Sequence, residues 1–497
     1  MSMAAAQPFV LAIDVGTSSL KTVVYAREGG ILASAAQRYE NAAPQAGWAE
    51  TNPLDWWEAL ITAAARLRER GADLKKVEVI GLTGQMHTLV MLDEAMQVVP
   101  PTMLWLDRRA VAETRELQQA FRLPPYQLNT TYSLPKLVWL ARRQPETIGR
   151  VRHVLWPKDY LRYRLTGRLA TDRTEAGGAA LLDWETLEWA RERLEWAGIS
   201  PEILPPFLAP TDEAGPLLPE IVKAFGLRRD VKVITGVGDV LALVTGAPRA
   251  EGRVCCSMGS SSMIFGPVPQ GKTLRDPLGR IYTYPLLPYP LIGGVSSTSG
   301  AAIQWAYRSF FPSGQAFEAA VAEALETPPG SNGLIFLPFL SGERSPYWSD
   351  ALRGGYYGLT LAHTQAQLMR ATMEGVIYSL RRLLDIFEET GLPVEEVALA
   401  GGGALMPGLP QLAADICGKP VKVFSGQETV TAGLFALACQ ALDPRVSFEQ
   451  TLEKTFRPPE CVEPRKESTS VYARLYQQYA RLADFANREL SSLDGEP

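Results

Sequence analysis

The hydrophobic pattern of the chain alternates between short apolar runs and longer amphipathic stretches, which predicts an α/β protein. Three runs rich in valine, isoleucine or leucine lead into glycine, as buried strands do when they open into loops: 77–84 (VEVIGLTG), 231–239 (VKVITGVGD) and 394–403 (VEEVALAGGG). Apolar residues recur at helical spacing in three longer stretches, which predict helices: 54–70, 366–391 and 471–490. Gly391 is expected just beyond the end of the second helix.

Two stretches share one layout, in which a strand, a turn of glycine with small hydroxyl residues and a second strand follow each other: 11–25 (LAIDVGTSSLKTVVY) and 252–267 (GRVCCSMGSSSMIFGP). Their similarity suggests a duplicated fold. Glycine lets the backbone approach a ligand, and the turns add hydroxyl and amide donors that suit phosphate oxygens: Thr17, Ser18, Gly259, Ser260 and Ser261. Either hairpin alone is an ordinary β-hairpin, but the pair favours a bound polyphosphate. Asp14, just before the first turn, would then hold Mg²⁺ together with phosphate oxygens.

Composition limits the classes of protein to which the chain can belong. A length of 497 residues is too great for one core, so two large domains are expected, with the boundary in the short polar segment at 247–253. The net charge of -5 lacks the basic excess that nucleic acid or an anionic membrane would require. Five cysteines without framework spacing fit a reduced protein, in which Cys255 and Cys256 are buried apolar residues rather than metal ligands. The start of the chain lacks a secretion signal and no apolar run is long enough to span a bilayer, so a cytoplasmic protein is expected.

A third glycine cluster, AGGGALMPG at 400–408, follows a predicted strand and precedes a helical run. It suits nucleotide contact, although an ordinary strand-to-helix turn would have the same composition. The phosphate-binding pattern GxxxxGK[ST] is absent, and no glycine run has the GxGxxG spacing of dinucleotide-binding folds.

Nine segments in a fixed order carry a resemblance to a known family: DVGTSSLK (14–21), GWAETNPLDWW (47–57), GQMH (84–87), WPKDYLRYRLTG (156–167), GVGD (236–239), SGAAIQW (299–305), GERSPYW (342–348), GGYYGLT (354–360) and AGGGA (400–404). The chain resembles the FGGY carbohydrate kinases nearly from end to end. The resemblance implies two actin-like, ribonuclease H-like ATPase domains with ATP and sugar in the cleft between them. It divides the chain into an N-terminal domain at 1–248, a C-terminal domain at 249–457 and a helical tail at 458–497.

The resemblance also implies roles for individual residues. Asp239 in GVGD matches the aspartate that takes the proton from the sugar hydroxyl during transfer of the γ-phosphoryl group, although an aspartate there could simply cap a helix. Asp14 matches the acid that binds the metal, and Lys21 matches a basic position that reaches phosphate or lies exposed on a strand. Five further residues match nucleotide contacts: Gly300, Gln304, Gly402, Gly403 and Ala404. Three positions depart from the family's usual residues. Ser260 stands where threonine is usual, and Pro407 and Gly408 stand where asparagine is often found.

The identity of the sugar rests on conflicting segments. Met86 and His87 in GQMH, with the segments at 156–167 and 171–178, resemble xylulokinases. The segments GRIYTYPLL, LIGGVSSTSG, GERSPYW and MEGVIYSL resemble gluconokinases instead. Trp105 and Arg108 align with a segment near the sugar, where an arginine would pair with a gluconate carboxylate or form a surface ion pair. We expect D-xylulose, because Met86, His87 and Asp239 together suit a ketose or polyol better than an acid, with D-gluconate or another polyol as the alternative.

Other functions of the same fold remain open at this point. Chaperone-type ATPases and filament proteins share it, but they do not require GQMH, GVGD and GERSPYW. A sugar sensor without activity is a further alternative, against which the retention of Asp14 and Asp239 argues. The apolar aromatic stretch at 284–292 is a candidate interface of a homodimer or a cover over the core.

Overall fold

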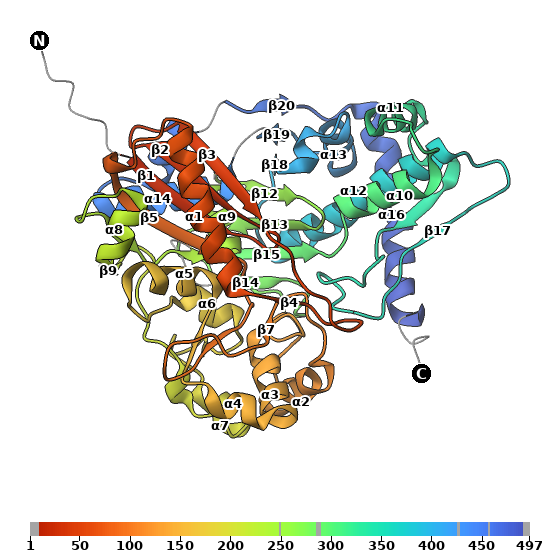
Figure 1. Cartoon of the computed structure of the whole chain (residues 1–497). Helices are drawn as coiled ribbons and strands as arrows, with labels where there is room; N and C mark the ends of the chain where they lie inside the picture. Colours follow the sequence, from red (N-terminus) through yellow and green to blue (C-terminus); the bar gives the residue numbers. More distant parts are fainter. Residues whose placement is uncertain (1–8, 248–249, 285–289, 425–427, 456–457, 491–497) are drawn as a thin grey trace, which may run out of the picture. The chain divides into compact units, whose positions relative to one another are not determined.

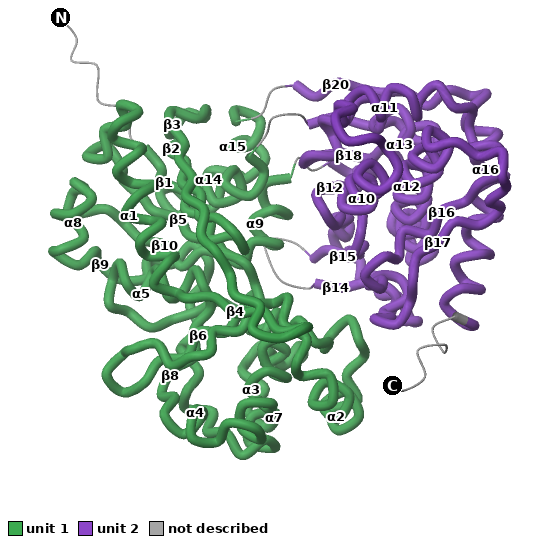
Figure 2. Tube along the Cα trace, turned by 45° about the vertical axis from the view of Figure 1, so that its right-hand side comes forward, with its two compact units in different colours: residues 1–247, 428–456 green, residues 248–427, 457–497 purple. Residues whose placement is uncertain are grey.

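The computed structural model describes residues 9–247, 250–284, 290–424, 428–455 and 458–490 (Figure 1). The chain forms two compact units, coloured separately in Figure 2. Unit 1 comprises Met1–Ala247 and Glu428–Phe456, and unit 2 comprises Pro248–Gln427 and Arg457–Pro497. Most of the candidate interface at 284–292 lies outside the described residues.

A seven-stranded sheet forms the centre of unit 1. Its strands follow the order β3 (Ile31–Arg38), β2 (Ser19–Ala26), β1 (Phe9–Val15), β5 (Val77–Gly84), β10 (Lys232–Ile234) and β9 (Glu213–Pro216), and β11 (Val237–Gly238) also pairs with β5. β1 is antiparallel to β2 and parallel to β5. Leu11, Ile13 and Val15 pack into a core with α1 (Pro53–Glu69). Because side chains alternate along a strand, Asp14 lies on the opposite face of β1.

That opposite face is covered by α14 (Thr429–Leu442), which also packs on α9 (Asp239–Gly246). Both helices have a glycine at the contact. A Cβ on Gly246 would lie 1.8 Å from the Thr429 carbonyl oxygen, and one on Gly433 would lie 1.9 Å from the Ala242 carbonyl oxygen. The structure therefore assigns residues 428–456, including α15 (Phe448–Thr455), to unit 1, whereas the sequence-based division placed them in the C-terminal domain.

The remaining elements of unit 1 are α2 (Val111–Phe121), α3 (Ser133–Arg143), α4 (Pro145–Arg150), α5 (Pro157–Thr166), α6 (Arg173–Gly178), α7 (Arg191–Trp196) and α8 (Pro219–Phe225), with the paired strands β4 (Glu50–Thr51) and β7 (Thr102–Met103), and β6 (Val90–Leu92) and β8 (His153–Leu155). Among them, α5 and α8 pack into the same core as α1, whereas residues of α2, α3, α7, β6, β7 and β8 build a second, mainly helical core. The helix α5 packs on β5 of the sheet. The loop between β5 and β6 belongs to the candidate site.

Unit 2 repeats the pairing pattern of unit 1. Its sheet has the order β14 (Tyr282–Tyr284), β15 (Leu291–Ser296), β13 (Ser262–Pro267), β12 (Arg253–Met258), β18 (Glu396–Ala400), β19 (Val421–Val423) and β20 (Glu460–Val462). From β15 to β20 the pairings are antiparallel, antiparallel, parallel, parallel and antiparallel, as they are from β3 to β9 in unit 1. The duplication predicted from the two hairpins is therefore confirmed.

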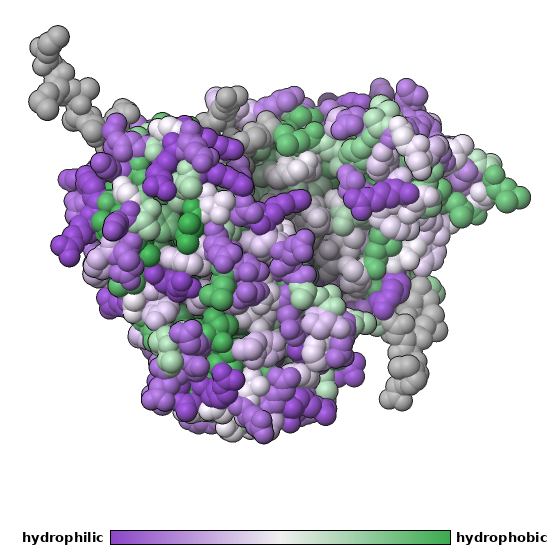
Figure 3. Space-filling model, in the orientation of Figure 1, coloured by the Kyte–Doolittle hydropathy of each residue, from purple (hydrophilic) through white to green (hydrophobic). Residues whose placement is uncertain are grey.

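The helices of unit 2 are α10 (Gly300–Phe310), α11 (Phe317–Glu326), α12 (Gln365–Glu389), α13 (Leu409–Cys417) and α16 (Lys466–Phe485), and β16 (Ile335–Leu337) pairs with β17 (Gly355–Tyr357). Thr364 and Gln367 form a capping box at the start of α12. Gly391, with φ +91, follows the end of α12, as predicted. The face of the protein in Figure 3 mixes hydrophilic and hydrophobic residues, and large exposed apolar side chains such as Leu361 are scattered.

Candidate active site

The first hairpin turn, between β1 and β2, is held by hydrogen bonds from several segments of unit 1. Gly16 N–H donates to the Ser19 carbonyl at 3.0 Å, and the Tyr39 hydroxyl donates to the Gly16 carbonyl. Trp105 Nε1 donates to Thr17 Oγ1 at 2.9 Å, so Trp105, predicted near the sugar, supports the turn predicted to bind phosphate. Ser18 is exposed at the tip of the turn.

Asp14 and Lys21 lie opposite each other in the β1–β2 register. Burial and the nearby negative charge of Asp239 raise the pKa of Asp14 to about 7, while Lys21 opposes the shift. Lys21 Nζ forms an ion pair with Glu428 Oε2 at 2.5 Å, and about a third of each side chain remains exposed. The Lys21 ammonium is thus held by the residue that precedes α14, in a partly exposed position.

Asp239 is the first residue of α9 and follows a broken strand. The predicted strand at 231–239 is divided into β10 and β11, because Gly236 adopts φ +73 and a Cβ there would lie 1.8 Å from the Leu82 carbonyl oxygen. Val240 N–H donates to Asp239 Oδ1 at 2.7 Å. Burial raises the pKa of Asp239 to about 6, and the N–H groups of Val240 and Met86 limit that rise.

Met86 and His87 lie in the loop after β5, next to two glycines. A Cβ on Gly178 or on Gly238 would lie 2.5 Å from Met86 side-chain atoms, so the absence of both side chains makes room for Met86 beside Asp239. His87 has φ +68, which is uncommon for a residue with a side chain. Its Nδ1 hydrogen bonds to the Gly178 carbonyl, and its ring lies 4.8 Å from that of Tyr132. α6 therefore orients His87.

Arg108 and a residue that the sequence analysis missed, Lys136, lie around this loop. Arg108 Nη1 donates to Thr130 Oγ1 at 3.0 Å. Lys136 is fully buried and donates to the carbonyls of Thr131 at 2.9 Å and His87 at 3.4 Å. Burial lowers the pKa of the Lys136 ammonium to about 7; Asp107 opposes this shift, and the neighbouring Arg108 contributes to it. No motif marked Lys136, because a lysine within an amphipathic helix is usually exposed.

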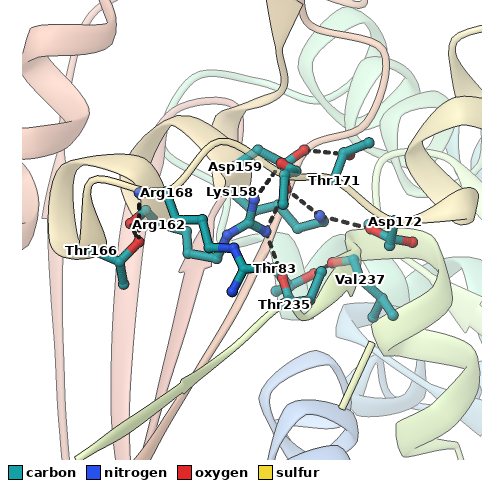
Figure 4. A network of polar contacts seen from close by, with 12 residues as sticks. Thr83, Lys158, Asp159, Arg162, Thr166, Arg168, Thr171, Asp172, Thr235 and Val237 are labelled. Atoms are coloured by element: carbon teal, nitrogen blue, oxygen red, sulfur yellow. Dashed lines mark hydrogen bonds and ion pairs between the residues drawn. The ribbon is translucent and has the colours of Figure 1, made fainter. Parts of the chain in front are cut away.

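A fully buried network of charged residues supports the loops behind Asp239 (Figure 4). Lys158 Nζ lies 2.6 Å from Asp159 Oδ1 and 2.7 Å from Asp172 Oδ2, and Arg162 Nη1 lies 2.9 Å from Asp159 Oδ1. Although burial alone would lower it, the pKa of Lys158 is raised by the two aspartates. Arg162 also donates to the Thr235 carbonyl at 3.2 Å. The network thus connects α5 with the strand segment that leads to Asp239.

Glu175 is the exception among the buried charged residues near Asp239. Its side chain is fully buried, and neither carboxylate oxygen has a hydrogen-bond partner in the described part of the chain. Burial raises its pKa well above the usual range; Lys158 opposes this, while Asp159, Asp172 and Asp239 add to it. Burial without a hydrogen-bond partner among these residues therefore favours the neutral carboxylic acid of Glu175 over its carboxylate.

The second hairpin turn, in unit 2, borders a cavity of about 670 Å³. Six residues predicted to bind the nucleotide line it: Gly259, Ser260, Gly300, Gln304, Gly402 and Gly403. Ser261 lies in the turn but not in the lining, and Ala404 is buried behind it. A Cβ on Gly300 would lie 2.5 Å from the Gly259 carbonyl oxygen, which explains the glycine at the start of α10.

The lining also includes residues that the sequence analysis did not propose as contacts: Trp305, Arg308, Phe317, Glu318, Leu405 and Met406. Pro407, one of the departures from the family's usual residues, is part of the lining. Gly408 is not; its φ of +72 and its contact with Leu325 give it a role in starting α13. An aromatic and aliphatic wall with glycines opposite suits a flat ring system.

Family models match both halves of the chain. The N-terminal domain of the FGGY family of carbohydrate kinases matches residues 9–246, and its C-terminal domain matches residues 254–442. The chain belongs to the FGGY family of carbohydrate kinases. It is therefore a phosphotransferase, and kinases of this family use ATP, normally with a divalent metal ion.

Curated relatives of this FGGY kinase extend over nearly its full length. The xylulose kinase of Bacillus subtilis is 30% identical over 483 residues, which cover 95% of this chain and 96% of that protein. The xylulose kinase of Lactococcus lactis is 33% identical over 422 residues, which cover 82% and 83%. The gluconokinase of B. subtilis is 26% identical over 506 residues, which cover 96% and 98%.

Solved structures of a gluconate kinase and of a xylulose kinase also match the chain. A gluconate kinase and a ligand-bound xylulose kinase, both from Lactobacillus acidophilus, each match with a TM-score of 0.90 at 27% identity, covering 98% of this chain and 100% of the other. The actin-like two-domain fold of FGGY kinases is thereby confirmed. Within the residues that the structure describes, no helix is long and apolar enough to cross a membrane.

Proposed function

We propose that this FGGY kinase phosphorylates D-xylulose with ATP, forming D-xylulose 5-phosphate and ADP. The observation that carries the proposal is the grouping of Met86, His87 and Asp239, which the glycines of α6 and β11 make possible. The names of the relatives support it, since both relatives at 30% identity or more cited above are xylulose kinases.

Asp239 is proposed as the catalytic base. With a pKa of about 6, its carboxylate is mostly ionised at neutral pH and still basic enough to accept a proton. The terminal hydroxyl oxygen of the sugar attacks the γ-phosphorus, its proton passes to Asp239, and the bond from the γ-phosphorus to the bridging oxygen breaks to release ADP. Asp239 must lose the proton to solvent before the next turnover.

His87 and Met86 are proposed to contact the sugar, because the imidazole is held by Gly178 and Met86 packs beside Asp239. Arg108 is proposed as a further sugar contact, because it lies near Lys136, which donates to the His87 carbonyl. Trp105 Nε1 already donates a hydrogen bond to Thr17. We therefore propose that Trp105 supports the site between sugar and phosphate, and that its Nε1 makes no direct polar contact with the sugar.

The nucleotide is proposed to bind to both hairpin turns and to the cavity of unit 2. Thr17, Ser18 and Lys21 of the first turn, and Gly259, Ser260 and Ser261 of the second, would contact phosphates. The adenosine would lie in the cavity against five residues: Gly300, Gln304, Gly402, Gly403 and, from behind, Ala404.

The acids of unit 1 fit a magnesium ion. Asp14 has a raised pKa because it is buried near the like charge of Asp239, and a cation would relieve that cost. The part of the chain that the structure describes holds no group of three or more His, Cys, Asp or Glu residues that could bind a metal. Asp14 would therefore share the ion with phosphate oxygens and water, and the ion would neutralise phosphate charge.

Gluconate is the second candidate, favoured by one feature of the site. Arg108 lies near the loop of His87, and a guanidinium pairs well with a carboxylate. A gluconokinase and a gluconate kinase structure also occur among the similar proteins.

The test is ADP release by the purified protein with MgATP and, in turn, D-xylulose, D-gluconate, D-ribulose, L-ribulose, glycerol and L-fuculose. We expect the highest kcat/KM with D-xylulose, and no sugar-dependent ADP release by Asp239→Ala, which should still bind ATP. A preference for gluconate would replace the proposed substrate, whereas sugar binding without turnover by the unchanged protein would favour a sensor.

A further inference from the structure

The loop that precedes α10 and the first two residues of α10 together shape the second hairpin turn. Ser299 N–H and Ala301 N–H donate to the Ser260 carbonyl at 2.8 and 3.1 Å, and Gly300 N–H donates to the Gly259 carbonyl at 3.0 Å. Both turn residues line the cavity of unit 2. The conformation of the turn therefore depends on where residues 297–299 are held.

Glu343 holds this loop from the other side. Its side chain is only 3% exposed. Oε1 accepts hydrogen bonds from Ser297 N–H at 2.6 Å and Arg344 N–H at 2.8 Å, and Oε2 accepts one from the Ser296 hydroxyl at 2.9 Å. Because one carboxylate joins two segments, moving it would release the loop from its support.

The segment that carries Glu343 is itself rigid. Glu343 and Ser349 exchange two backbone hydrogen bonds at 2.9 Å. Ser345 N–H donates to the Val295 carbonyl at 2.9 Å, and Ser341 Oγ lies 2.9 Å from Thr298 Oγ1. None of these residues lines the cavity, so the segment acts on the hairpin only through the loop.

We infer that Glu343 is a positioning residue for the nucleotide phosphates: it fixes the loop at 296–299, which in turn fixes the phosphate-binding turn at Gly259–Ser261. This inference rests on the proposed binding of ATP at that turn. A change at Glu343 should therefore weaken the binding of the phosphates but not that of adenosine. The helix α10 is anchored independently by Ala302, Ile303 and Ala306, which are fully buried in the core.

The test is calorimetric titration of the full chain, in the presence of Mg²⁺, with ATP, ADP and adenosine. Glu343→Ala leaves the N–H groups of Ser297 and Arg344 without their acceptor. We expect affinity for ATP and ADP to fall by about tenfold, the effect of leaving buried N–H groups without their hydrogen-bond partner. Affinity for adenosine should remain unchanged.

Glu374→Gln is the matched control, because Glu374 is a second buried glutamate of unit 2 that accepts from a backbone N–H and a serine hydroxyl, those of Gly330 and Ser331. It should lower thermal stability without changing ATP affinity. Glu343→Asp serves if the alanine variant does not fold, since its shorter side chain cannot keep all three contacts and should weaken the binding of ATP and ADP but not that of adenosine.

Unchanged ATP affinity in these Glu343 variants would overturn the inference, and so would equal losses for ATP and adenosine. Failure of the unchanged protein to bind ATP would instead overturn the proposed nucleotide site, and the inference with it. The two failures are thus distinguishable by the behaviour of the unchanged protein.

Discussion

Replacing Glu175 with glutamine should stabilise the protein, and by more as the pH rises. Glutamine has nearly the same shape as a protonated glutamic acid but cannot ionise. In the folded state the carboxyl group is buried with no hydrogen-bond partner among the described residues, which raises its pKa well above the usual range. In the unfolded chain the same group ionises near its ordinary pKa of about 4.3.

The sign and size of the effect follow from proton linkage. Between the unfolded and the folded pKa, the folded protein holds one proton more than the unfolded chain, so the free energy of unfolding falls as the pH rises. The slope is at most about 1.4 kcal/mol per pH unit, and it applies between the unfolded pKa and the raised folded pKa. Glu175→Gln removes this term, and the variant should gain up to that amount per pH unit over the unchanged protein across the interval.

Urea unfolding of both proteins at several pH values, followed by tryptophan fluorescence, measures the difference. Glu185→Gln, at an exposed position of the same unit, controls for the exchange of glutamate for glutamine as such. A difference for Glu175→Gln that does not change with pH would refute the reasoning. A variant less stable than the unchanged protein at neutral pH would show that Lys158 keeps the carboxylate ionised.

Three further predictions concern the residues around Asp239. Because Asp239 must be ionised to accept a proton, kcat/KM measured at saturating Mg²⁺ should fall on the acid side with an apparent pKa of about 6, and a flat profile through that range would contradict its role as base. Gly236→Ala should destabilise unit 1 by about 3 kcal/mol or more in thermal or urea unfolding, because its Cβ would lie 1.8 Å from the Leu82 carbonyl oxygen at a φ of +73. His87→Ala should raise KM for the sugar by about tenfold without raising KM for ATP, as initial-rate kinetics would show; an equal rise in both would exclude a direct sugar contact.

Local patterns predicted the elements of the fold well. The run at 77–84 is the strand β5 to the residue, and the helices predicted at 54–70 and 366–391 begin one residue earlier and end one or two residues earlier. The glycine-rich turns were also visible, since turn chemistry depends on neighbouring residues. The break between β10 and β11 was not predicted, because it results from contact of Gly236 with Leu82, which is distant in sequence.

Buried charges were harder to predict than the motif that contains them. Lys158 and Asp159 stand in WPKDYLRYRLTG, a segment that the sequence analysis used only as a sign of family resemblance. An amphipathic pattern places such residues at the surface, whereas here Asp172 and Arg162 complete a fully buried set of ion pairs. Asp172 comes from a separate segment, the residue before α6, so the spacing within α5 alone does not reveal how Lys158 is neutralised.

The placement of α14 shows how a distant segment can determine the candidate site. Its sequence, TVTAGLFALACQAL, is apolar on nearly all sides, so periodicity gives no face and no partner. Gly433 fits closely against α9 of unit 1, and Glu428 at its start then meets Lys21 of the first hairpin. The position of the Lys21 ammonium, which is proposed to reach phosphate, therefore depends on a residue that follows almost all of unit 2 in the sequence. Reading the chain as two consecutive domains separates Lys21 from this partner, and only the packing of the two helices brings them together.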